Sequence, residues 1–87
     1  MSRSFAWRPV TPEPPPGGYI DLAVWHLLCE MRGIEDGQTE EMVVDPDDIH
    51  WLRGAAAATH AVETAAEIEE LIGVLRSSGA VVIKVEH

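Results

Sequence analysis

Apolar and polar residues alternate at the C-terminal end of the chain, in the segment AVVIKVEH (80–87). This period of two places Val81, Ile83 and Val85 on one face of an expected β-strand. A strand is not stable alone, so this segment must pair with another. The best partner is SFAWRPV (4–10), whose own alternation predicts a strand that brings the two chain ends together.

The N-terminal strand also carries a signal for its end. Phe5 and Trp7 would share one face, and Ala6 and Arg8 the other. Pro9 has no N–H group to donate to a sheet, so the strand should lie at an edge or stop at this residue. The segment MVV at residues 42–44 is a candidate for a short third strand.

Three other segments have the spacing of helices, over residues 20–32, from Asp45 to about residue 58, and over residues 61–77. Asp45 suits the N-cap of the second helix, and a break between the second and third helices is expected at residues 59–64. Together these elements predict an α+β fold, with three helices packed on a small two- or three-stranded sheet formed by the N- and C-terminal segments. At 87 residues the chain is expected to be a single domain.

The first helix is apolar on two sides. Its broad stripe consists of Ile20, Ala23, Val24, Leu27, Leu28 and Met31, and a narrower stripe on the opposite side consists of Leu22, Trp25 and Cys29. A helix with two apolar sides is either central to the core or covered by something else. The N-terminal arm, a second copy of the chain or another protein could each cover the narrower stripe.

Residues 8–19 form a Pro/Gly-rich arm that connects the first strand to the first helix. Its P-x-x-P matches lack the flanking cation that sets the direction of binding in SH3-type ligands, and Gly17 and Gly18 separate Pro16 from Tyr19, which spoils a P-P-x-Y site. We therefore expect a stiff connector packed on the core, anchored by Trp7 and Tyr19.

The chain has six Lys and Arg residues against 15 Asp and Glu residues, a net charge of −9. Such a surface repels nucleic-acid phosphates and anionic lipids, so we expect neither nucleic acid nor membrane as a partner. The single cysteine excludes an internal disulfide and fits a reducing, cytoplasmic location. The N-terminal residues show no apolar run typical of a signal peptide.

His26, Cys29 and Glu30 have the spacing of neighbours on one helix face. They give the alternative hypothesis of a metal- or small-ligand-binding protein, although no second cluster with ligand spacing accompanies them. Cys29 lies beside Trp25, an apolar setting that does not activate a thiol, and no phosphate-binding glycine loop is present. We expect no catalytic site, no cofactor and no metal.

The segment from residue 35 to residue 48 holds seven carboxylates and no basic residue. It lacks the ligand spacing of a calcium loop, and a solvated loop, a docking surface for a basic partner and a cation site are its three interpretations. The sequence thus predicts a non-catalytic interaction or regulatory module (an adaptor, an inhibitor or an immunity-like protein) that binds another protein or forms a homodimer. The candidate partner-binding residues are Leu22, Trp25, Cys29, Glu35, Asp36, Glu40 and Glu41.

Overall fold

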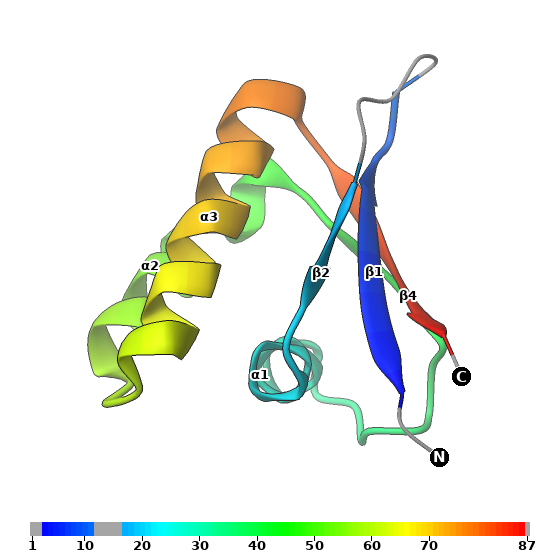
Figure 1. Ribbon diagram of the computed structural model, residues 1–87, viewed down its shortest axis with the longest axis horizontal. Coiled ribbons are helices and arrows are strands. Elements are labelled where there is room, and N and C mark those ends of the chain that lie inside the picture. Colours follow the sequence, from blue (N-terminus) through cyan, green and yellow to red (C-terminus); the bar gives the residue numbers. More distant parts are fainter. Residues whose placement is uncertain (1–2, 12–16, 87) are drawn as a thin grey trace.

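The computed structural model describes residues 3–11 and 17–86. Its elements, in chain order, are β1 (Ser4–Pro9), β2 (Gly18–Ile20), α1 (Leu22–Arg32), β3 (Glu41–Val44), the short 3-10 helix η1 (Pro46–Asp48), α2 (Ile49–Ala58), α3 (Val62–Ser78) and β4 (Val81–Glu86). The strands form one antiparallel sheet in the order β2-β1-β4-β3, and the three α-helices pack against one side of it (Figure 1). The predicted α+β fold is confirmed, with four strands in the sheet instead of two or three.

The two ends of the chain pair as the sequence predicts. β1 and β4 are antiparallel neighbours, in register from Ser4 opposite Glu86 to Pro9 opposite Val81. β1 is a central strand, yet Pro9 costs the sheet no hydrogen bond, because β2 extends only as far as Gly18, opposite Trp7. The chain ends therefore supply the two middle strands of the sheet (Figure 1).

β2 is the strand that the sequence analysis missed. Tyr19 and Ile20, expected at the end of an arm and at the start of a helix, pair instead with Ala6 and Phe5 of β1. Helix α1 consequently begins at Leu22, because Asp21 is its N-cap and accepts a hydrogen bond from the Leu22 N–H.

The remaining helix boundaries follow local signals. Gly33 adopts a left-handed conformation (φ 69°) that ends α1, as glycine does at this position in many helices. Asp45 caps η1 in a reciprocal capping box with Asp48, so the predicted helix start is present, although its first turn is a 3-10 turn. The expected break falls at Thr59, which ends α2 before α3 begins at Val62.

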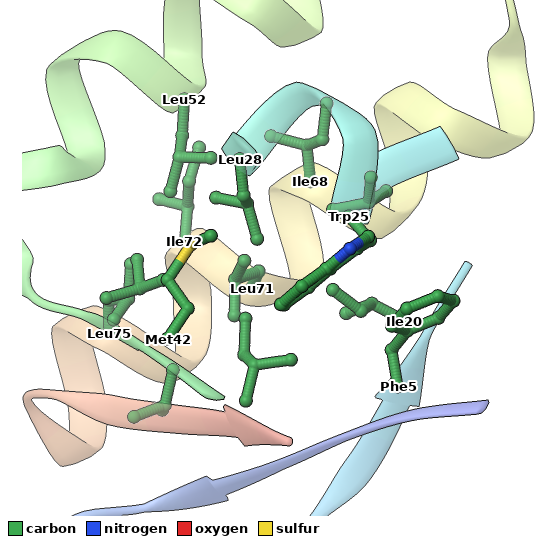
Figure 2. Close-up of a cluster of buried hydrophobic side chains, with 14 of the residues drawn as sticks. Phe5, Ile20, Trp25, Leu28, Met42, Leu52, Ile68, Leu71, Ile72 and Leu75 are labelled. Atoms are coloured by element: carbon green, nitrogen blue, oxygen red, sulfur yellow. The ribbon is translucent and has the colours of Figure 1, made fainter. Parts of the chain in front are cut away.

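One hydrophobic core fills the space between the helices and the inner face of the sheet (Figure 2). Trp25 of α1 is fully buried and stacks on Phe5 of β1, with ring centroids 5.2 Å apart and an angle of 21° between the ring planes. α3 contributes the buried side chains of Ile68, Leu71, Ile72 and Leu75 to the core.

The predicted arm is only partly within the described residues. Arg8 and Pro9 belong to β1, and Gly18 and Tyr19 belong to β2, so these parts are strands and not a connector. Residues 12–16, which were expected to pack on the core, lie outside the described residues. Trp7 packs against the core as expected, but Tyr19 is 67% exposed and anchors nothing there.

Candidate functional site

The narrow stripe of α1 does not form an exposed surface. Trp25 is completely buried and Cys29 is 3% exposed, because the sheet and the segment after α1 cover this side of the helix. Only Leu22, at 42% exposure, reaches the solvent among the three residues of the stripe. Trp25 and Cys29 are therefore part of the core. Of the possible covers for the stripe, the structure shows the chain itself.

Asp36 connects three distant parts of the molecule. Its carboxylate accepts two hydrogen bonds from the Arg3 guanidinium, at 2.8 and 2.7 Å, and one from the buried Trp25 indole N–H at 3.1 Å. His26 Nε2 lies 3.0 Å from the same carboxylate. Asp36 thus ties the residue before β1 and two residues of α1 to the loop that follows α1.

The electrostatic state of Asp36 reflects these contacts. Hydrogen bonds from Arg3 first, and then from His26 and Trp25, hold the pKa of Asp36 well below its usual range. Burial raises the pKa of the Cys29 thiol, with the nearby Asp36 charge acting in the same direction. Asp36 is therefore a structural carboxylate, already engaged within the chain.

The His26, Cys29 and Glu30 set is dispersed by the fold. The imidazole of His26 is directed to Asp36, and Cys29 is buried in the core, while Glu30 is exposed. Residues 3–11 and 17–86 contain no group of three His, Cys, Asp or Glu side chains arranged to hold a metal ion. The pKa of the Cys29 thiol is raised overall, although the Arg3 charge acts against the burial, and the side chain is only 3% exposed.

The acidic segment is also largely engaged in internal contacts. Asp45 accepts the Asp47 N–H in the capping box, and Asp48 pairs with the Arg32 guanidinium at 2.8 Å. Glu41 lies across the sheet from Lys84, with 3.8 Å between carboxylate oxygen and ammonium nitrogen. Glu35 is exposed, like Glu40, whose backbone carbonyl also accepts the Val85 N–H. Several of these carboxylates therefore stabilise turns and helix ends, and the segment is not one continuous acidic surface.

The side of the sheet that faces away from the helices forms a different kind of surface. Antiparallel register places one row across all four strands, consisting of Tyr19, Ala6, Lys84 and Glu41. The next row consists of Arg8, Val82 and Val43. We call this surface the outer sheet face, and its residues are Ala6, Arg8, Val10, Tyr19, Glu41, Val43, Val82, Lys84 and Glu86.

Large apolar side chains are concentrated on the outer sheet face. Val10, Tyr19 and Val43 are 56%, 67% and 50% exposed, and they account for three of the five exposed large hydrophobic residues in the described chain. Two hollows lie on this face, of about 300 Å³ between Tyr19 and Val82 and of about 630 Å³ between Val10 and Val43. Exposed apolar side chains that gather on one face are typical of an interaction site.

The outer sheet face is also electrically neutral in a strongly acidic chain. Arg8 and Lys84 balance Glu41 and Glu86, so the net charge of −9 resides on the rest of the molecule. The alternation of both chain ends had placed Arg8 and Lys84 on the sides opposite the core. It gave no sign that Tyr19 and Val43 would join them, because only the register of β2 and β3 brings those residues onto this face.

The β3 edge of the sheet is closed by side chains. The Thr39 hydroxyl donates to the Glu41 carbonyl at 2.7 Å and accepts the Glu41 N–H at 3.3 Å, and the Arg32 guanidinium donates to the Val43 carbonyl at 2.7 Å. The Glu40 carbonyl accepts the Val85 N–H, so alternation along the strand directs the polar groups of Glu41 and Val43 away from β4. Side chains thus occupy the Glu41 N–H and the carbonyls of Glu41 and Val43, three of the groups that an added strand would use.

A second hollow surface lies on the helical side. A groove of about 590 Å³ runs between α1 and α2, with the half-buried Trp51 and Leu27 as its largest apolar side chains and Glu30 and His50 at its rim. None of the exposed large hydrophobic residues lines it. The groove therefore presents fewer exposed apolar side chains than the outer sheet face does.

No helix among the described residues has the length and apolar character needed to cross a membrane. Comparison of the chain with models of protein families, with curated proteins and with solved structures finds no match. The geometry of the surface is therefore the basis for assigning a function.

Proposed function

We propose that this chain is a non-catalytic interaction or regulatory module that binds a protein partner through the outer sheet face. The observation that carries the proposal is the exposure of Val10, Tyr19 and Val43 together on one side of the sheet that no helix covers. A cytoplasmic site of action is part of the proposal, because the single cysteine of the chain suits a reducing compartment.

The composition of the face supports contact with a protein. Tyr19 on β2, Val82 on β4 and Val43 on β3 spread apolar surface across the sheet, and the charged Arg8 and Lys84 lie on the two middle strands. Protein interfaces combine apolar contact area with hydrogen-bonding groups, and aromatic residues and arginine are enriched in them. The tyrosine adds a rigid, amphipathic contact group of the type that often dominates binding energy.

The mode of contact follows from the closed edge. Because Thr39 and Arg32 occupy the Glu41 N–H and the carbonyls of Glu41 and Val43, a partner is not expected to add a strand at that edge. Contact would instead be made by packing on the face of the sheet. Side-chain substitutions on that face should therefore affect binding more than changes at the edge.

Two valine substitutions test the proposal. Val43→Asp places a charge in the outer sheet face, and Val62→Asp places the same charge on α3, where the valine is 83% exposed. We expect proximity cross-linking in cells, followed by quantitative mass spectrometry, to identify a protein that wild type and Val62→Asp capture and Val43→Asp loses. A partner set that is the same for all three proteins would overturn the proposal, as would a wild-type protein that captures nothing.

A further inference from the structure

We infer that the outer sheet face binds a second copy of the same chain, in a two-fold symmetric pair that stacks sheet on sheet. This inference rests on the proposed function and specifies its partner. A symmetric interface must be complementary to itself, because the same patch is contributed by both copies. A patch of one charge sign fails this requirement, and a patch with both signs meets it where the axis brings opposite charges together.

Two of the four charges of the outer sheet face, Arg8 and Glu86, meet this requirement by position. Glu86 lies in the row opposite Ser4, Lys84 in the middle row opposite Ala6, and Arg8 in the row opposite Val82. Glu86 and Arg8 are therefore displaced to opposite sides of the middle row. A two-fold axis across the strands along that row would exchange the outer rows and bring Arg8 of each copy to Glu86 of the other.

Arg8 and Glu86 are free to make this contact. Both are exposed, and neither makes an ion pair to another residue of the described ranges, 3–11 and 17–86. Lys84 and Glu41 pair within each chain, and the axis places each of them opposite its own copy and one strand away from the oppositely charged residue of the other copy. The offset between neighbouring strands, about 4.8 Å, is within the reach of an arginine side chain.

The remaining surface of the chain disfavours self-association. The net charge of −9 lies outside the outer sheet face, so two copies that met through other surfaces would repel each other. On the neutral outer sheet face the repulsion is least, and three of the five exposed large hydrophobic residues of the described chain lie there. Four short strands offer a small area, so we expect a weak pair of the class that buries less than about 1,200 Å².

Charge exchange between the two positions gives a specific test. Analytical ultracentrifugation over a wide concentration range should show reversible dimers of the wild type. Arg8→Glu places two carboxylates in contact and Glu86→Arg places two guanidinium groups in contact, so each variant alone should dimerise about tenfold more weakly or worse. An equimolar mixture of the two variants should recover dimers, since every contact in the mixed pair joins opposite charges.

Arg53→Glu provides the matched control, because it makes the same change of charge at an exposed position of α2. We expect it to dimerise like wild type, and circular dichroism of every variant checks that the fold is intact. Wild type that stays monomeric at all concentrations would overturn the inference, and so would a mixture without recovery or a control as weak as Arg8→Glu. A monomeric wild type that still captures a partner sensitive to Val43→Asp would leave the proposed function standing.

Discussion

The buried indole N–H of Trp25 donates a hydrogen bond to Asp36, 11 positions later in the chain, with 3.1 Å between the nitrogen and Oδ1. The same carboxylate binds the Arg3 guanidinium through both oxygens. A residue that stacks in the core and a residue at the N-terminal end of β1 thus share one acceptor. Asp36 is the point at which the first strand, the first helix and the loop after it are held together.

Replacement of Asp36 should destabilise the fold. Asp36→Ala leaves the buried Trp25 N–H without its acceptor, whereas Asp36→Asn retains one carbonyl oxygen and loses the charge and the second acceptor oxygen. We expect the urea midpoint to fall in the order wild type, Asp36→Asn, Asp36→Ala. Glu35→Ala is the matched control, because it removes an exposed carboxylate next in sequence. Equal midpoints for Asp36→Ala and Glu35→Ala would contradict this role.

The contribution of Asp36 should depend on pH in one direction. The folded state holds the pKa of Asp36 below the value of about 3.9 expected in the unfolded chain, so the unfolded state takes up the proton first as the pH falls. The stabilisation is therefore complete above that value and declines below it. Urea unfolding at several pH values should show the difference between wild type and Asp36→Asn shrinking below about pH 4. A difference that stays constant through the acid range would contradict the prediction.

Two leucines of α1 should differ sharply in their effect on stability. Leu28 is fully buried, and Leu28→Ala should lower the free energy of unfolding by about 2–5 kcal/mol, through lost burial and the cavity left behind. Leu22 is 42% exposed, and Leu22→Ala should cost clearly less. Chemical denaturation of the two variants makes the comparison on one helix. Equal losses would mean that the two sides of α1 are buried alike.

The closed β3 edge should protect the chain from aggregation. Thr39→Val and Arg32→Met together free the Glu41 N–H and the carbonyls of Glu41 and Val43, and Arg32→Met also removes the ion pair to Asp48. We expect the double variant to aggregate faster than wild type in light scattering at a temperature where both are folded. Asp48→Asn weakens the ion pair and leaves both edge contacts in place. Equal aggregation of Asp48→Asn and the double variant would assign the effect to the ion pair instead of the edge.

Much of the fold could be predicted because its signals are local. The alternation in residues 80–87 and the capping residues around Asp45 each depend on a few neighbouring positions, and both are present in the structure. β2 was missed because three residues are too short to show a period. The start of α1 was misplaced because Ile20 fits the apolar spacing of the helix, although it pairs with Phe5 as part of β2.

The surface residues were harder to predict because register brings them together. Nothing near Asp36 in the sequence indicates that Arg3, 33 positions away, will bind it. The sequence places Trp25 and Cys29 on an apolar stripe that must be buried, but only the tertiary structure shows that other parts of the same chain bury it. In the same way, Tyr19 and Val43 share the outer sheet face only because β2 and β3 flank the paired chain ends.

The most direct test of the central claim, that the outer sheet face joins two copies of the chain, is a concentration series of amide NMR spectra. We expect the amide signals of Ala6, Tyr19, Val43 and Val82 to shift as the protein is concentrated from micromolar to near millimolar, while those of α2 and α3 stay constant. The same series with Arg8→Glu should show little change at these positions. Shifts confined to α2 and α3, or no shifts at any concentration, would contradict the claim.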